Sequence, residues 1–189
     1  MADEAAIQDL IEKMTREREA LLHEVSGLDT RAIDRVPVGK TGEEQWTVKE
    51  QLAHLCVMER SYDAWVAACL RDDDPDLSTV AIEPVAIPIA AANGHALQEL
   101  LDAMAAERLR TRALIDGLRP EDYDRTGRQP MFGRLTVLQW LRSFYRHDRM
   151  HRDQIAGRDP EYKPRFVNGV EPDQRGVRPP GAAAKGFGE

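Results

Sequence analysis

Apolar residues recur along four stretches of the chain at the i, i+3, i+4 spacing that is typical of amphipathic helices. Charged residues fill the remaining positions, so each stretch has one apolar face and one polar face. Glycine, or an aspartate run followed by proline, stands at the ends of these stretches. Such residues terminate helices, so they mark the expected helix ends. The pattern predicts helices over residues 3–26, 47–71, 94–117 and 136–157.

Two of the predicted helices have a recognisable first turn. Thr47 precedes Glu50, and Thr136 precedes Gln139, with the spacing of a capping box. In a capping box the threonine side chain accepts a hydrogen bond from a backbone N–H, and the glutamate or glutamine side chain accepts one from the threonine N–H. Trp46 stands directly before the first cap, where a large apolar residue can pack against the first turn. We therefore expect well-defined starts for both helices.

The segments between the predicted helices show no sustained period. Residues 28–46 are expected to cross one end of the molecule, and residues 76–93 contain two prolines, which favour an irregular crossover over a short strand. Four helices with such connections predict an all-α fold, a four-helix bundle with long crossover connections. One bundle domain is expected over residues 1–160. Residues 161–189 are rich in proline and glycine and are expected to form a mobile C-terminal tail, or an arm that orders against a neighbouring subunit.

Composition narrows the classes of function. The 189 residues carry a formal net charge of −7, which disfavours broad contact with nucleic-acid phosphates. There is no apolar run of about 18 residues, and Met1 is followed by Asp3 and Glu4 instead of a basic and apolar leader, so we expect a cytoplasmic protein without a membrane partner. Cys56 and Cys69 lie about 20 Å apart along one predicted helix and are expected to be buried and not joined.

The most informative pair of residues is His147 and His151, in the last predicted helix. Residues four apart on a helix differ by about 40° in direction and about 6 Å along the axis, so both imidazoles can point at one ion. The pair continues the stripe of Trp140 and Phe144, which indicates an interior face. The pair alone leaves two interpretations open, a metal site or core-edge imidazoles hydrogen-bonded to neighbours. His54, two turns into the second helix, is by itself typical of an ordinary helix histidine.

Asp148 is adjacent to the first histidine of the pair. Neighbouring positions on a helix point about 100° apart, so Asp148 is poorly placed to orient a ligand histidine. We expect it in a surface or bundle-end salt bridge with Arg149 or Arg152.

Three segments together resemble the DinB-like (DinB/YfiT-like) family, which is related to thiol-dependent transferases and maleylpyruvate isomerase. They are Trp46-Thr47-Val48-Lys49-Glu50-Gln51-Leu52-Ala53-His54-Leu55, Leu135-Thr136-Val137 and His147-Asp148-Arg149-Met150-His151. The resemblance covers residues 3–157. It implies a four-helix bundle with a crossover, often dimeric, that holds a divalent metal through three histidines. Carried over residue by residue, the implied ligands are His54, His147 and His151.

Three neutral imidazoles with an open position are typical of a catalytic metal site, and Zn²⁺ or Ni²⁺ suits such nitrogen ligands, with Fe and Mn as further candidates. The first hypothesis is a metal-dependent enzyme acting on a small molecule. It would be either a thiol-dependent S-transferase or isomerase that uses a low-molecular-weight thiol, or a hydrolase that uses water. The alternative is a non-catalytic metal or small-molecule binding module, and a third hypothesis is a structural bundle that pairs through apolar helix faces. A homodimer is the expected assembly.

Overall fold

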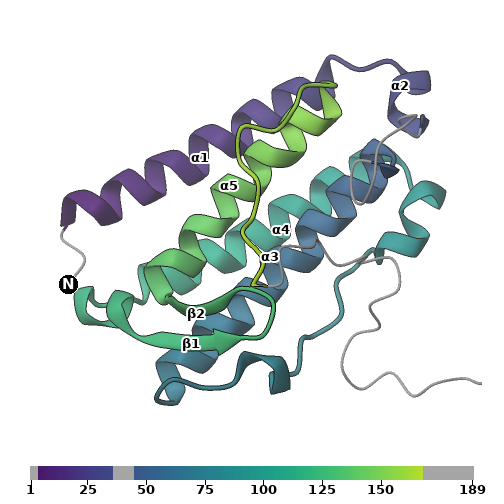
Figure 1. Cartoon of the computed structure of the whole chain (residues 1–189). Coiled ribbons are helices and arrows are strands. Elements are labelled where there is room, and N and C mark those ends of the chain that lie inside the picture. The colour runs from purple at the N-terminus through teal and green to yellow at the C-terminus, as the bar shows by residue number, and fades with distance from the viewer. Residues whose placement is uncertain (1–3, 36–44, 168–189) are drawn as a thin grey trace, which may run out of the picture.

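The computed structural model describes residues 4–35 and 45–167, and its long helices form a bundle (Figure 1). The predicted all-α four-helix bundle with long crossover connections is confirmed. A short helix, α2, follows the first long helix. The helices are α1 (Glu4–Ser26), α2 (Thr30–Asp34), α3 (Val48–Arg71), α4 (Leu97–Asp116) and α5 (Val137–Ile155).

The two capping boxes form as expected. The Glu50 N–H donates to Thr47 Oγ1 at 3.1 Å, and the Thr47 N–H donates to Glu50 Oε2 at 2.8 Å. Thr136 and Gln139 make the same pair of hydrogen bonds at 3.2 and 2.8 Å. The first N–H groups of a helix have no carbonyl in a preceding turn to donate to. The capping side chains accept from these groups and so fix where α3 and α5 begin.

The long connection after α3 determines the topology. It contains two short 3₁₀ segments, η2 (Leu77–Thr79) and η3 (Ile89–Gly94), and η3 packs on α3. This irregular crossover was predicted. It carries the chain back along the bundle, so α3 and α4 run in one direction and α1 and α5 in the other (Figure 1). Parallel neighbours of this kind are possible only when a connection is long enough to span the bundle.

A β-hairpin that the sequence analysis did not anticipate joins α4 to α5. After the 3₁₀ segment η4 (Pro120–Asp124), strands β1 (Thr126–Gln129) and β2 (Gly133–Thr136) pair antiparallel. The hairpin packs tightly against the end of α3 and against η2. A Cβ added to Gly127 would lie only 2.6 Å from Cys69 Sγ and 2.9 Å from Leu77 Cδ1. Glycine is therefore the residue that this contact accommodates.

The core is divided into two apolar clusters. One cluster surrounds Trp65 and Trp140 near the hairpin, and the other surrounds Leu52 and Met104 toward the opposite end. On α1, the buried Arg18 lies between residues of the two clusters, and buried polar residues of α4 occupy the same level. Charged side chains thus cross the bundle at mid-height, beside the position of the predicted histidine site.

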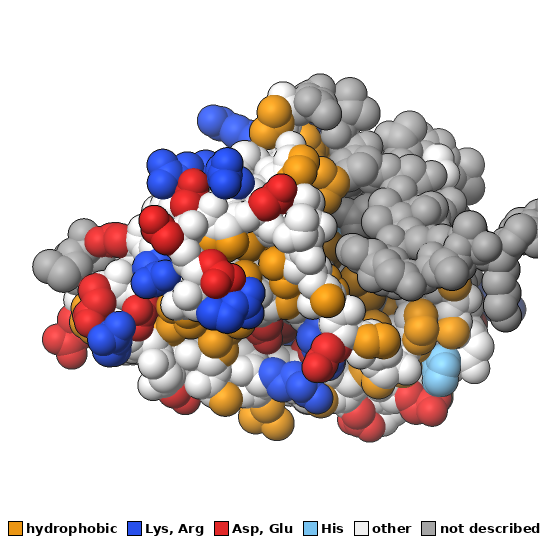
Figure 2. Space-filling view, turned by 90° about the horizontal axis from the view of Figure 1, so that it is seen from below, with side chains coloured by type: hydrophobic (Ala, Val, Ile, Leu, Met, Phe, Trp, Pro, Cys, Tyr) orange, Lys and Arg blue, Asp and Glu red, His pale blue; other side chains and the backbone are white. Residues whose placement is uncertain are grey.

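Outside this layer, charge is distributed over the surface. Figure 2 shows one face on which acidic and basic side chains are interspersed, with hydrophobic side chains between them. Cys56 and Cys69 are both buried and form no disulfide, as expected. Within the described ranges, none of the helices has the length and apolar character needed to span a bilayer.

Candidate metal centre

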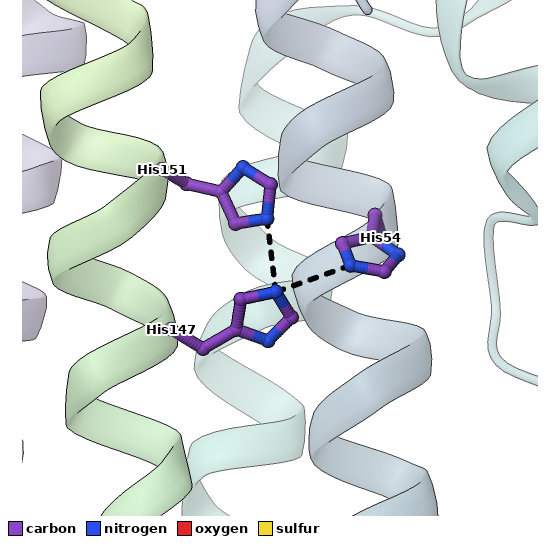
Figure 3. A group of neighbouring side chains, drawn as sticks. All are labelled: His54, His147 and His151. Carbon is purple, nitrogen blue, oxygen red and sulfur yellow. Dashed lines mark hydrogen bonds between the residues drawn. The ribbon is translucent and has the colours of Figure 1, made fainter. Parts of the chain in front are cut away.

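The fold brings the three predicted residues together. His54 projects from α3, and His147 and His151 project from successive turns of α5 toward it (Figure 3). The His147 Nε2 atom lies 3.2 Å from His54 Nε2 and 3.0 Å from His151 Nε2. His54 and His151 are fully buried, and His147 is 8% exposed. The expected interior direction of the histidine pair is confirmed, whereas the role of these residues as ligands stays a prediction.

Gln51, one turn before His54 on α3, fixes the orientation of His151. Its side-chain N–H donates to the Trp46 carbonyl at 3.2 Å, which turns Gln51 Oε1 toward His151 Nδ1 at 3.1 Å. An amide oxygen only accepts, so His151 Nδ1 carries the hydrogen and its Nε2 presents a lone pair to the centre. Trp46 also packs edge-on against the His54 ring, with centroids 4.9 Å apart. These supporting roles were not assigned from the sequence, although both residues lie in the quoted motif.

The separations fit a cation better than a hydrogen-bond network. Two nitrogens bound to one ion at 2.0–2.1 Å lie about 3.3–3.4 Å apart at a tetrahedral angle, and about 2.9 Å apart at a right angle. The observed 3.0 and 3.2 Å lie between these values. A single hydrogen on His147 Nε2 can serve one of the two contacts well and the other poorly. A cation accepts lone pairs from all three rings.

The donor set determines what an ion here would do. The cluster in the described part of the chain consists of histidines alone, with no cysteine or carboxylate among its members. Neutral ligands leave the full positive charge on the ion, and three of them leave at least one position for a further molecule. The residues present therefore fit a catalytic divalent ion.

The expectation for Asp148 was wrong. Asp148 is 1% exposed and accepts hydrogen bonds from Arg18 Nε and Nη2, each at 3.0 Å, and from Arg108 Nη2, also at 3.0 Å. Arg149 pairs instead with Glu161, and Arg152 with Glu17. The 100° step that turns Asp148 away from the histidine centre points it between α1 and α4, and not toward solvent.

Charge balance keeps the Asp148 carboxylate ionised. Burial alone would raise its pKa, but the adjacent Arg18 and Arg108 guanidiniums outweigh that effect and hold the pKa below its usual value. Glu59 of α3 completes the layer, with Arg18 Nη2 at 2.7 Å and Arg108 Nε at 2.8 Å. We call these four residues, Arg18, Glu59, Arg108 and Asp148, the ion layer. It ties α1, α3 and α4 to the turn of α5 that carries His147.

A small cavity lies between the ion layer and His147. Its volume is about 10 Å³, enough for roughly one water molecule. Arg18, Glu59 and His147 are among the residues that line it, together with the Tyr62 ring. The sequence does contain a signal for the layer, because Arg18 interrupts an apolar stripe between Met14 and Leu21.

Comparison with known proteins agrees with this architecture. Residues 13–155 match the model of the DinB superfamily. The chain belongs to the DinB superfamily. The DinB-superfamily fold also appears in solved structures. YfiT from Bacillus subtilis, described as a probable metal-dependent hydrolase with an unusual four-helix bundle topology, superposes with a TM-score of 0.64 at 16% identity, over 83% of this chain and 87% of YfiT.

A second solved structure, the four-helix bundle protein TT2238, has a TM-score of 0.58 at 20% identity, covering 80% of this chain and 98% of TT2238. Among curated proteins, none matches this chain. At such identities the solved structures establish the fold of this DinB-superfamily member, and its chemistry has to be argued from its own residues.

Proposed function

We propose that the protein is a metal-dependent enzyme that binds one divalent cation through the Nε2 atoms of His54, His147 and His151. The observation that carries the proposal is the convergence of three buried imidazoles from two helices, with ligand nitrogens within 4.8 Å of one another and two of the separations, 3.0 and 3.2 Å, in the range of metal-bound nitrogens. A divalent ion bound there supplies Lewis acidity toward a water or a thiol at its open position. Zn²⁺ or Ni²⁺ suits the all-imidazole set best, with Fe and Mn as further candidates.

The surrounding residues support this chemistry in two ways. Gln51 holds His151 with its Nε2 lone pair toward the centre, as outer partners of metal-binding histidines do. Glu59 and Asp148 are already paired with arginines, so they neither compete for the ion nor cancel its charge. The ion would then retain the electrophilic character that hydrolysis or thiol transfer requires.

Hydrolysis of a small molecule is the preferred reaction class, because YfiT, which shares the fold, is described as a probable metal-dependent hydrolase. Thiol-dependent transfer or isomerisation, with a low-molecular-weight thiol as co-substrate, rests on the family resemblance. The alternative function is a binding module in which the ion joins α3 to α5 without turnover. The size of the cavity beside His147, about 10 Å³ in the described part of the chain, favours that alternative.

Elemental analysis of untagged protein is the first test. We expect about one divalent ion per chain in the wild type, and loss of that ion in His54→Ala. The matched control is His95→Ala, because His95 lies at the start of α4 and pairs with Glu99, away from the centre. An absence of metal from wild-type protein, even after incubation with divalent ions, would exclude the metalloenzyme.

Activity assays then separate the enzyme from the binding module. The metal-loaded protein would be tested on ester, amide and phosphoester substrates, on glutathione conjugation, and on maleylpyruvate isomerisation. Turnover that is present in His95→Ala and lost in His54→Ala supports catalysis. Stoichiometric metal and a lower melting temperature on chelation, without turnover on any substrate, would support the binding module instead.

The homodimer implied by the family resemblance is proposed on that ground alone. Light scattering of the full chain would give twice the monomer mass of 21.3 kDa for a dimer. A mass equal to the monomer across the concentrations used in the activity assays would rule the dimer out as the working form.

A further inference from the structure

A second cavity lies on the opposite side of α5 from the histidines. Its volume is about 270 Å³, and it is bounded by α1, α5 and the segment that follows α5. Tyr145, Arg146 and Arg149, which α5 contributes, lie about 120–180° around the helix from the direction of the histidine pair. Anything bound in this cavity would therefore be separated from the metal centre by the body of the helix.

The chain builds one wall of this cavity after α5 ends. Gly157 has a φ of +71°, a left-handed conformation that turns the backbone sharply. Residues 158–167, which we call the strap, then run back along the bundle toward the hairpin (Figure 1). The Val167 N–H donates to the Met131 carbonyl at 2.8 Å, and the Phe166 and Phe132 rings lie 5.4 Å apart. The strap is thus attached at its far end and holds Glu161 and Tyr162 over α5.

Positive charge predominates in this cavity. Its lining contains four basic residues, Lys13, Arg16, Arg146 and Arg149, and two acidic residues, Glu17 and Glu161. The lining therefore carries a formal charge of +2 (four cations minus two anions), in a chain whose net charge is −7. Such a local excess attracts anions, and the low-dielectric walls of a cavity strengthen the attraction.

Arg146 is the cation best placed to meet a ligand. Its guanidinium lies 5.8 Å from the Tyr145 ring centre and 5.5 Å from the Tyr162 ring centre, and it forms no ion pair with a carboxylate of the described residues. By contrast, the other three cations are paired: Arg149 with Glu161, Arg16 with Glu17 at 3.0 Å, and Lys13 with Asp9 at 2.6 Å. Contact with two aromatic rings restricts the guanidinium, and a hydrogen bond to the Tyr162 hydroxyl uses part of its donor set. A guanidinium has five N–H donors, so others are left for a ligand.

Tyr162 adds a neutral donor. Burial raises the pKa of its phenol, so the hydroxyl stays protonated near neutral pH and can donate to an oxyanion. The Tyr145 and Tyr162 rings, whose centres lie 5.8 and 5.5 Å from the Arg146 guanidinium, also provide flat apolar surfaces.

We propose that this cavity binds a small dianion with a flat apolar body, of the class of aromatic phosphate monoesters. A charge of +2 matches the roughly −2 charge of a phosphate monoester near neutral pH. The planar fork of Arg146 suits paired phosphate oxygens. The volume is slightly below the roughly 300–1,000 Å³ of typical ligand pockets, so the ligand is a small molecule. The proposal does not depend on the metal centre or on the proposed enzyme activity.

Calorimetric titration of the full chain with phenyl phosphate tests the proposal. Metal is first removed by chelation, because an oxyanion would also bind to an ion held by the histidines. We expect one saturable site, weaker binding of inorganic phosphate, no measurable binding of phenol, and an affinity that falls as salt is added. Equal affinities for phenyl phosphate and inorganic phosphate would overturn the aromatic part of the proposal. No saturation up to about 10 mM would overturn it entirely.

Variants locate the site. Arg146→Gln should weaken phenyl phosphate binding by about tenfold or more, because a charge-assisted bidentate contact is lost. Arg142→Gln is the matched control, one turn earlier on α5 and outside the cavity lining, and should bind as the wild type does. Lys13→Gln on α1 leaves the strap contacts intact and should also weaken binding, so a disturbed strap cannot account for both results. Equal effects of Arg142→Gln and Arg146→Gln, or unchanged binding in Arg146→Gln, would contradict the assignment.

Discussion

At the scale of single residues, the geometry of the histidine cluster depends on side chains outside the three histidines. Gln51 selects which nitrogen of His151 carries the hydrogen, and its own orientation is set by the Trp46 carbonyl. Asp148 is adjacent to a predicted ligand yet serves the ion layer, where two arginines surround it. The role of each residue follows from its direction and its partners, and not from its distance along the chain.

Gln51→Leu should weaken Zn²⁺ binding by about 10- to 100-fold, which is the usual effect of removing an outer hydrogen-bond partner from a ligand histidine. The substitution removes the acceptor of the His151 Nδ1–H and leaves an apolar side chain at this buried position. Affinity would be measured by competition with a chromophoric chelator. Gln98→Leu, at an exposed position of α4, is the control and should bind Zn²⁺ normally. Equal Zn²⁺ affinities in the two variants would show that Gln51 has no role in metal binding.

A second residue-scale prediction concerns Asp63, beside the ion layer on α3. Burial, and then the negative charge of Glu59, raise the pKa of Asp63 to about 7. Thr111 Oγ1 lies 2.9 Å from Glu59 and 3.1 Å from Asp63, but it has one hydrogen to donate. A proton on Asp63 lets both contacts be hydrogen bonds, because Asp63 then donates to the threonine oxygen.

The sign of the pH effect follows from this pKa. Below the unfolded pKa of 3.8, Asp63 is protonated in both states and has no effect on stability. Between pH 3.8 and about 7, the unfolded chain releases the proton and the folded chain keeps it, so the free energy of unfolding falls as pH rises. Asparagine does not titrate in this range. Between about pH 5 and pH 7, the free energy of unfolding should therefore fall by about 1–3 kcal/mol less in Asp63→Asn than in the wild type. Urea unfolding of both proteins at the two pH values measures it, and parallel pH dependences would contradict the prediction.

At the scale of elements, local signals predict local structure. Thr47 and Thr136 begin α3 and α5 as expected, because a capping box is complete within four residues. The β1–β2 hairpin gave no such signal, since its strands are four residues each and are too short to show a two-residue period. The histidine pair was visible because its spacing lies within one helix. Arg18 within an apolar stripe signals one buried charge, but its partners in the ion layer could not be read from the sequence, because they come from other helices and meet it only in the folded bundle.

Gly127→Ala tests how tightly the hairpin is packed against α3. The new Cβ would lie 2.6 Å from Cys69 Sγ and about 3 Å from two carbons of Leu77. Such overpacking costs about 1–3 kcal/mol of unfolding free energy. Gly94→Ala is the matched control, because nothing lies within 4 Å of its Cβ position. Thermal unfolding should show a lower melting temperature for Gly127→Ala alone. Equal melting temperatures for the two variants would mean that the hairpin shifts to accommodate the new Cβ at little cost in stability.

At the scale of the whole molecule, the ion layer lies between the two apolar clusters of the core. Charges at mid-height specify which residues of the four helices meet, because a shift by one helical turn would leave Arg18 opposite apolar side chains. The same level of the bundle holds His147, so the layer and the histidine cluster share the turn of α5 around Asp148. Helix register and site geometry therefore depend on the same contacts.

Arg18→Gln should be among the most destabilising substitutions in this protein. It removes the bidentate partner of Asp148 and the 2.7 Å contact to Glu59, and leaves Arg108 as the one arginine for two buried carboxylates. Loss of one partner from a buried ion pair costs about 3–5 kcal/mol. Urea unfolding measures the effect, with Arg110→Gln on the exposed face of α4 as a control that should change stability by less than about 0.5 kcal/mol.

If the variant remains folded, its Zn²⁺ affinity should fall by less than that of His54→Ala, because the three imidazoles remain and only the register of α5 is loosened. A stability equal to that of Arg110→Gln would show that Arg108 and water satisfy both carboxylates, and that the register of the bundle is set by apolar packing alone.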